Sequence, residues 1–147
     1  MDTSQIQIIL QLLLSLVLGG AIGLEREYKR KGAGLQTYSL VALGACIFTI
    51  INSGIFYFFA GQAGITFDPS RIILAVATGI GFIGAGVIIY KQDHIEGLTT
   101  AAGLWLVSAI GVAVGMEFYL LSIASSVLAI IVLVVFGELE KIIFKDR

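Results

Sequence analysis

The sequence predicts an all-α membrane protein, a polytopic bundle of about five transmembrane helices. Of its 147 residues, 58% are hydrophobic and 13% are charged, and the mean hydropathy is +1.00. A soluble domain carries about 25% charged residues, and a chain this short has too little interior to bury so many apolar side chains. The chain also contains five apolar runs, each near the roughly 20 residues that cross a bilayer.

The runs are roughly Ile6–Leu24, Leu35–Ala60, Ile72–Tyr90, Leu98–Met116 and Phe118–Phe136. The first lacks the basic region of a secretory signal, so we expect an uncleaved helix. The second is long enough to tilt. The last two are separated only near Gly115-Met116-Glu117, but the 39 residues from Leu98 to Phe136 are too many for one crossing. We expect one domain, residues 1–147, whose tail continues the last helix.

Basic residues predict the orientation of this bundle. Eight of the nine would lie on one side of the membrane, and Arg71 would lie on the other. By the positive-inside rule, the side with eight is cytoplasmic, which places the N-terminus outside and the C-terminus inside. The eight are Arg26, Lys29, Arg30, Lys31, Lys91, Lys141, Lys145 and Arg147.

Several classes of function are disfavoured. A net charge of −1 gives no reason to expect a nucleic-acid partner. Cys46 is the only cysteine and lies in an apolar run, where we interpret it as a packing residue. His94 is the only histidine, and no Ser-His-Asp or Cys-His set can be assembled around it. We therefore expect neither an enzyme nor a bound cofactor.

Gly79, Gly81 and Gly84 spell GxGxxG within an apolar run. A dinucleotide site needs this motif between a strand and a helix, so we interpret these glycines, with Gly86, as helix-packing positions. Small residues let helix backbones approach closely in a membrane. Three sets of small residues are spaced four residues apart, as such packing requires: Ala77/Gly81/Ala85, Gly19/Gly23 and Gly111/Gly115. Whether each face packs within the chain or in a homodimer is left open.

Two separate polar clusters are predicted at the ends of the spans. The inner one holds Glu25 and Arg26 where the first helix leaves the membrane, facing Thr99 and Thr100. Ionisable groups at such depth snorkel, pair or face a polar cavity, so a structural ion pair and a functional site both remain open. Lys29, Arg30 and Lys31 are interpreted as solvated charges.

The outer cluster holds Asp68 and Arg71. Asp68 followed by Pro69 is typical of an N-cap and first helical residue. Arg71 either snorkels to headgroups or pairs with Asp68 or Glu117. At the start of the fourth span, a threonine cap is expected, with free amides that favour anions.

Cation transport would require oxygen ligands. The acidic candidates all lie at span ends, whereas transporters commonly bind their ions near the middle of the membrane. The candidates are Glu25, Asp68, Asp93, Glu96 and Glu117. These residues favour a compact membrane module over a pump, and they leave any metal site undetermined.

Five segments together resemble the membrane domain of the MgtC/SapB family, in order and in spacing. They are GLERE at 23–27, AGLQT at 33–37, DPSR at 68–71, GIGFIGAGVI at 79–88 and GLTTAAGLW at 97–105. The resemblance implies a bacterial inner-membrane protein of about five helices, linked to growth at low magnesium and to virulence. Members have been described as Mg²⁺ transporters, and one resembles an inhibitor of the rotary ATP synthase.

The family pattern carries over onto Glu25, Arg26, Thr37, Asp68, Arg71, Gly81, Gly84, Gly86, Thr99, Thr100 and Trp105. Gln36 stands where the best-known members have arginine, so a charge role is lost there. Many members add a soluble C-terminal domain, and we expect this chain to be of the short form.

Two functional hypotheses follow. In the first, the protein modulates a membrane partner or membrane energetics and affects Mg²⁺ homeostasis indirectly. In the second, it is a transporter or channel for Mg²⁺ or a related ion. A purely structural or lipid-binding module is a third, weaker alternative. Membrane lipid, a second copy of the chain and another membrane protein are the expected partners.

Overall fold

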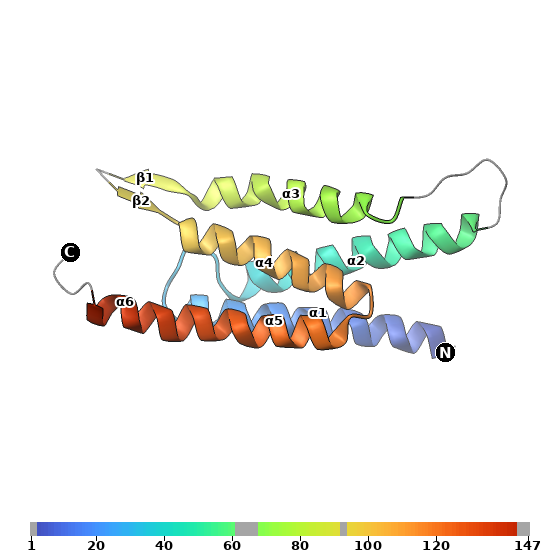
Figure 1. Ribbon diagram of the computed structural model, residues 1–147, viewed down its shortest axis with the longest axis horizontal. Helices are drawn as coiled ribbons and strands as arrows, with labels where there is room; N and C mark the ends of the chain where they lie inside the picture. The colour runs from blue at the N-terminus through green and yellow to red at the C-terminus, as the bar shows by residue number, and fades with distance from the viewer. Residues whose placement is uncertain (1–2, 61–67, 92–93, 144–147) are drawn as a thin grey trace.

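Helix α4 (Leu98–Gly115) lies at the centre of a helical bundle and contacts all the other long helices. The computed structural model describes residues 3–60, 68–91 and 94–143. Helices α1 (Thr3–Tyr28) and α5 (Tyr119–Ile131) pack on one side of α4, and α3 (Arg71–Val87) lies on the other (Figure 1). Helix α2 (Leu35–Phe59) packs mainly on α1 and α4.

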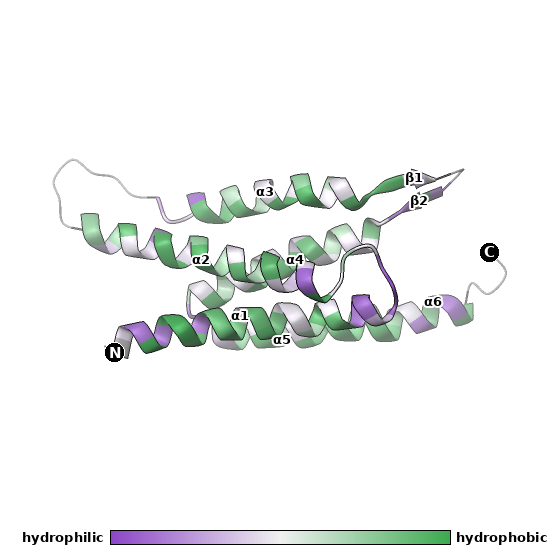
Figure 2. Cartoon of the chain, turned by 180° about the vertical axis from the view of Figure 1, so that it is seen from behind, coloured by the Kyte–Doolittle hydropathy of each residue, from purple (hydrophilic) through white to green (hydrophobic). Residues whose placement is uncertain are grey.

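The all-α prediction is confirmed. The helices α1, α2 and α4, and the continuous segment Tyr119–Ile143, are long and apolar enough to cross a membrane. Apolar residues cover most of their length, and hydrophilic residues gather toward the ends (Figure 2). Helix α3 has only 17 residues, about 26 Å, slightly less than the bilayer core of about 30 Å.

The predicted third span is too long at its C-terminal end. Helix α3 ends at Val87, and strand β1 (Ile89–Lys91) pairs antiparallel with β2 (His94–Glu96). The run Ile88-Ile89-Tyr90 is rich in β-branched and aromatic residues, which favour a strand. Tyr90 pairs with Ile95 across the hairpin. Asp93, one of the candidate acids, lies outside the described residues.

Two helices end in the same way, with a residue in the left-handed conformation. Arg30 (φ 53°) follows α1, and Glu117 (φ 66°) follows α4. At the second end, the amide of Phe118 donates to the carbonyl of Ala113 at 2.8 Å, and that of Glu117 donates to Val114 at 3.0 Å. This Schellman pattern satisfies the last carbonyls and reverses the chain within a few residues. It explains the tight joint that separates the last two spans.

The last segment continues beyond α5 as predicted, but with a local change of pitch. A π-helical turn, η1 (Val132–Phe136), connects α5 to α6 (Gly137–Ile143). Such turns are rare and often lie at functional sites. Lys145 and Arg147 lie outside the described residues.

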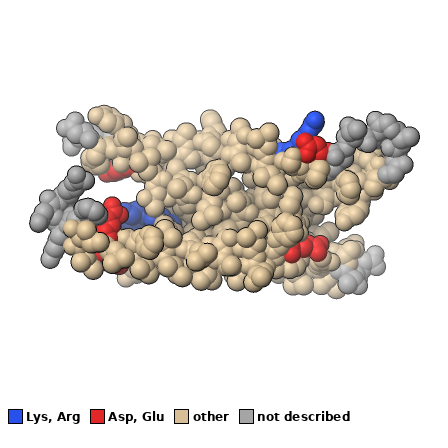
Figure 3. All heavy atoms as spheres, viewed as in Figure 1, with Lys and Arg blue, Asp and Glu red and all other residues tan. Residues whose placement is uncertain are grey.

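Charged side chains lie at the two ends of the bundle, with an uncharged middle between them (Figure 3). The loop after α1, the hairpin and α6 share one end, and the start of α3 lies at the other end with the N-terminus (Figure 1). This arrangement agrees with the predicted separation of Arg71 from the other basic residues. Which end faces the cytoplasm remains a prediction.

Candidate functional site

The inner polar cluster forms where α1 leaves the bundle. Arg26 Nη2 donates a 2.9 Å hydrogen bond to Thr100 Oγ1 at the start of α4. The predicted approach of Arg26 to the start of the fourth helix is therefore confirmed. Tyr38 Oη of α2 donates to the carbonyl oxygen of Thr100 at 3.1 Å. One residue of α4 thus ties together three helices.

Glu25 is the buried anion of this cluster. Its side chain is 9% exposed, and that of Arg26 is 5% exposed. Arg26 Nη1 lies 3.8 Å from Glu25 Oε2, and Lys29 Nζ lies 2.8 Å from Glu25 Oε1. Neither carboxylate oxygen accepts a well-aligned hydrogen bond from the part of the chain that the structure describes. The carboxylate therefore depends on the two nearby cations for compensation.

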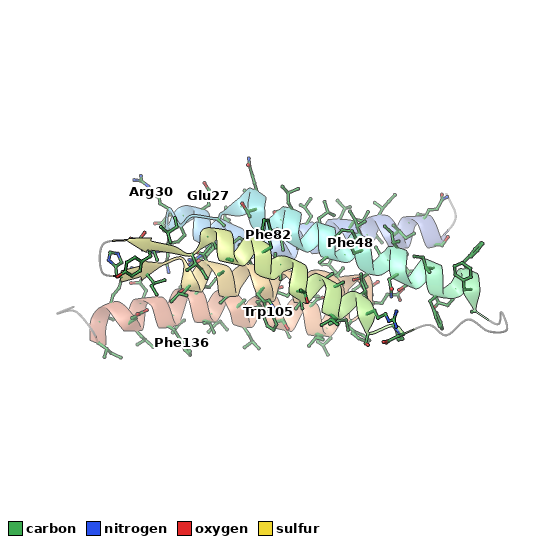
Figure 4. The ribbon with its side chains drawn as sticks, turned by 90° about the horizontal axis from the view of Figure 1, so that it is seen from above. Glu27, Arg30, Phe48, Phe82, Trp105 and Phe136 are labelled. Atoms are coloured by element: carbon green, nitrogen blue, oxygen red, sulfur yellow. The ribbon has the colours of Figure 1, made fainter. Side chains whose placement is uncertain are left out.

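Lys29 has a second partner, which the sequence did not reveal. Its Nζ donates a 2.9 Å hydrogen bond to the carbonyl oxygen of Leu133, inside the π-helical turn. The one sign in the sequence that Lys29 is paired was its i,i+4 spacing from Glu25. The interpretation of Lys29 as a solvated charge is wrong, because its side chain is only 21% exposed. By contrast, Arg30 and Glu27 lie at the end of the bundle (Figure 4).

The other two predicted members of the polar set lie elsewhere. Thr99 is exposed and lines a small apolar cavity of about 320 Å³ between α4 and the last helical segment. Thr37 is half-buried and lines a larger groove between α2 and α3. The predicted threonine cap of α4 is wrong. Gly97 occupies the N-cap with φ 93°, and Thr100 Oγ1 accepts the bond from Arg26 instead.

Asp68 and Arg71 form the predicted outer cluster at the opposite end of the bundle. Arg71 Nε lies 3.7 Å from Asp68 Oδ2. Asp68 Oδ1 accepts bonds from the amide of Ser70 at 2.9 Å and from its hydroxyl at 2.6 Å. The helix begins at Arg71, with Ser70 at the N-cap, so the predicted start at Pro69 is wrong. The carbonyl oxygen of Ser70 accepts the first i→i+4 hydrogen bond of the helix, because residues 68–71 form a tighter i→i+3 turn.

The two hydrogen bonds from Ser70 lower the pKa of the Asp68 carboxyl below its ordinary value, and the Arg71 charge adds to this effect. The carboxylate's contribution to stability is therefore present above the unfolded-state pKa of about 3.9. It is lost as the pH falls through the lowered folded-state pKa. We expect Ser70→Ala to raise the pKa of Asp68, as measured by NMR titration of the carboxyl carbon. An unchanged pKa would contradict the assigned cause.

The glycines divide into a packed set and an open set. A Cβ at Gly19, Gly23 or Gly115 would come within 2.9 Å of α2. One at Gly111 would overlap the carbonyl oxygen of Ala42. The two predicted pairs, Gly19/Gly23 and Gly111/Gly115, therefore pack within the chain.

Helix α3 differs, because only one of its glycines contacts another helix. A Cβ at Gly84 would lie 3.7 Å from the Cβ of Ala101 in α4, whereas one at Gly79, Gly81 or Gly86 would meet nothing within 4 Å. Trp105 is likewise largely exposed. These four residues are therefore open within the chain, because α3 contacts α4 on the side that holds the buried Ile80 and Gly84. Their packing against a second chain stays a prediction.

Among the described residues, no group of three or more His, Cys, Asp or Glu side chains could hold a metal ion. Most of the buried hydroxyl groups bond to carbonyls of their own helices. Thr49 donates to Ala45 at 2.8 Å, and Ser126 donates to Ser122 at 2.8 Å. Gln11 crosses from α1 to the carbonyl of Val114 at 3.2 Å. The hydroxyl groups are thus satisfied within their own helices, whereas the Gln11 amide links α1 to α4.

Comparison with known proteins gives one family. The model of the MgtC family matches residues 12–142. The Escherichia coli K12 protein named "Putative magnesium transporter YhiD" is 43% identical over 90% of this chain and 62% of its own length. Protein SapB of Bacillus subtilis is 42% identical over 80% of this chain and 51% of its own length.

Protein MgtC of Salmonella typhimurium is 37% identical over 82% of this chain and 48% of its own length. The chain thus spans 48–62% of the length of these curated relatives. No solved structure matches the chain.

Proposed function

Since the chain belongs to the MgtC family, we propose that it binds and modulates another membrane protein. Through that partner it would affect Mg²⁺ homeostasis, without carrying the ion and without enzymatic activity. We also propose that it lies in the bacterial inner membrane and crosses it several times. Its end with Arg26, Lys29 and Lys141 would face the cytoplasm, as the positive-inside rule predicts.

The observation that carries this proposal is the exposed side of α3. Gly81 and Ala85, four residues apart, are both exposed, and a Cβ at Gly81 would meet nothing within 4 Å. A glycine in a helix interior costs about 0.8–1.0 kcal/mol relative to alanine. In a membrane, close packing against a small residue of another helix can offset such a cost. We infer that a helix of the partner packs here.

The distribution of polar groups supports modulation more than transport. The buried carboxylate of Glu25 is paired with Arg26 and Lys29 at one end of the bundle. Asp68 lies at the opposite end. A magnesium ion in transit would require several oxygen ligands between them. Thr49 and Ser126, which are buried along the helices, donate instead to backbone carbonyls.

Magnesium transport is the second candidate function. It is favoured by the name of the 43% identical YhiD and by the burial of the Glu25 carboxylate. Mg²⁺ flux into proteoliposomes tests it. Flux above that of empty liposomes, lost in Glu25→Gln, would overturn our proposal in favour of transport.

Co-purification tests the proposed partner. We expect the wild-type protein, extracted from native membranes in mild detergent, to bring down a specific membrane protein, and Gly81→Leu to lose it. Gly54→Leu is the matched control, because a Cβ at Gly54 also meets open space but lies on α2. A monodisperse wild-type protein without a partner, or equal loss in both variants, would contradict the proposal.

A further inference from the structure

An apolar groove of about 700 Å³ runs between α2 and α3. Its position follows from the packing, since α3 rests on α4 and makes few contacts with α2. The volume lies within the range of about 300–1,000 Å³ that is typical of ligand sites. The groove is lined mainly by apolar residues of α2 and α3, among them Gly44, Phe48, Ile72, Gly79 and Ile83.

Two glycines widen this groove. A Cβ at Gly44 or at Gly79 would meet nothing within 4 Å, although both residues line it. Phe48 lies on α2, partway along the bundle (Figure 4). Gly79 and Gly81 are two residues apart and therefore lie on different sides of α3. The groove is therefore distinct from the side of α3 assigned to the partner protein.

The length of the groove matches one leaflet of a bilayer. Along α3 it extends from Ile72 to Ile83, about 16 Å at 1.5 Å per residue. Half of a hydrocarbon core of about 30 Å is about 15 Å. This length fits an extended acyl chain that reaches from one surface of the membrane to its middle.

A pair of opposite charges stands at one end of the groove. Ile72 lines the groove, and Arg71 precedes it with a side chain that is 83% exposed. Asp68, 51% exposed, lies one turn further out. Its Oδ1 accepts both bonds from Ser70, while its Oδ2 lies 3.7 Å from Arg71 Nε and can still accept a hydrogen bond.

We propose that this groove binds an acyl chain of a zwitterionic aminophospholipid, with phosphatidylethanolamine as the defining headgroup. Its phosphate would contact Arg71, and its ammonium would donate to Asp68. The order of groups along α3 matches that of the lipid: apolar groove, cation, then anion. Phosphatidylglycerol lacks the ammonium, and phosphatidylcholine carries a trimethylammonium that cannot donate a hydrogen bond. This proposal does not depend on the proposed function.

Native mass spectrometry of the purified protein with each of these three phospholipids tests the proposal. We expect phosphatidylethanolamine to be retained roughly fivefold more than the other two, as one favourable charge contact would give. Asp68→Asn should abolish this preference, and Arg71→Gln should lower the retention of all three. Gly44→Leu/Gly79→Leu should lose all three by filling the groove. Arg30→Gln, at the opposite end, is the charge control and should retain the wild-type pattern.

Three outcomes would overturn the proposal. Equal retention of all headgroups, unchanged by Asp68→Asn and Arg71→Gln, would mean bulk lipid only. A two-copy mass that is lost in Gly79→Leu would mean that a second copy fills the groove. No retained lipid would mean an empty site. Circular dichroism and elution volume check the folding of the leucine variants. If the leucine variants misfold, the variants at the exposed Asp68 and Arg71 still test the proposal.

Discussion

Replacing Arg26 by leucine is expected to lower the free energy of unfolding by about 3–5 kcal/mol, the usual cost of breaking a buried ion pair. The guanidinium is 5% exposed, lies 3.8 Å from the buried Glu25 carboxylate and donates to Thr100 at 2.9 Å. Without it, Glu25 is left with Lys29 as its cation. Reversible denaturation in lipid–detergent micelles measures the effect.

Arg30→Leu is the matched control for Arg26→Leu. It removes the same charge one turn later, from a side chain that lies at the end of the bundle (Figure 4), and should change stability by about 0.5 kcal/mol or less. The double variant Glu25→Leu/Arg26→Leu should recover part of the loss, because no unpaired carboxylate remains buried. If Arg26→Leu costs no more than Arg30→Leu, the cluster does not hold the helices together.

Alanine at Gly111 and alanine at Gly81 are expected to change stability in opposite directions. A Cβ at Gly111 would overlap the carbonyl oxygen of Ala42 and lie 3.0 Å from the Cβ of Ala45, so α2 must shift. Overpacking of this kind costs about 1–3 kcal/mol, occasionally more. A Cβ at Gly81 meets open space. The higher helix propensity of alanine should therefore raise the free energy of unfolding by up to about 1 kcal/mol.

The same denaturation experiment measures both alanine variants, and helical content by circular dichroism reports whether either one misfolds. Equal losses at Gly111 and Gly81 would mean that Gly81 is already packed in the isolated chain. In that case α3 would have no open side for a partner.

The sequence allowed most helices and one long-range contact to be predicted. Apolar run length determines where the four longest apolar segments lie. The approach of Arg26 to Thr100 follows from topology, because the first and fourth spans both place polar ends at the same surface. The pairing of Asp68 with Arg71 follows from their spacing of three residues.

Other features depend on packing that no local pattern encodes. The bond from Lys29 to the Leu133 carbonyl exists because folding brings the π-helical turn of the last helical segment beside the end of α1. The glycines of α3 have the same spacing signature as packed ones, yet only Gly84 contacts another helix. The end of α3 was missed because an apolar run such as Ile88–Tyr90 suits a membrane helix and a strand equally well.

Photo-crosslinking in native membranes tests most directly whether α3 binds a partner protein. A benzoylphenylalanine at position 81 would project from the open side of α3, and one at position 16 replaces an exposed leucine of α1. We predict a discrete adduct with a second membrane protein from position 81 and none from position 16. No adduct at position 81, or the same adducts from both positions, would contradict the account.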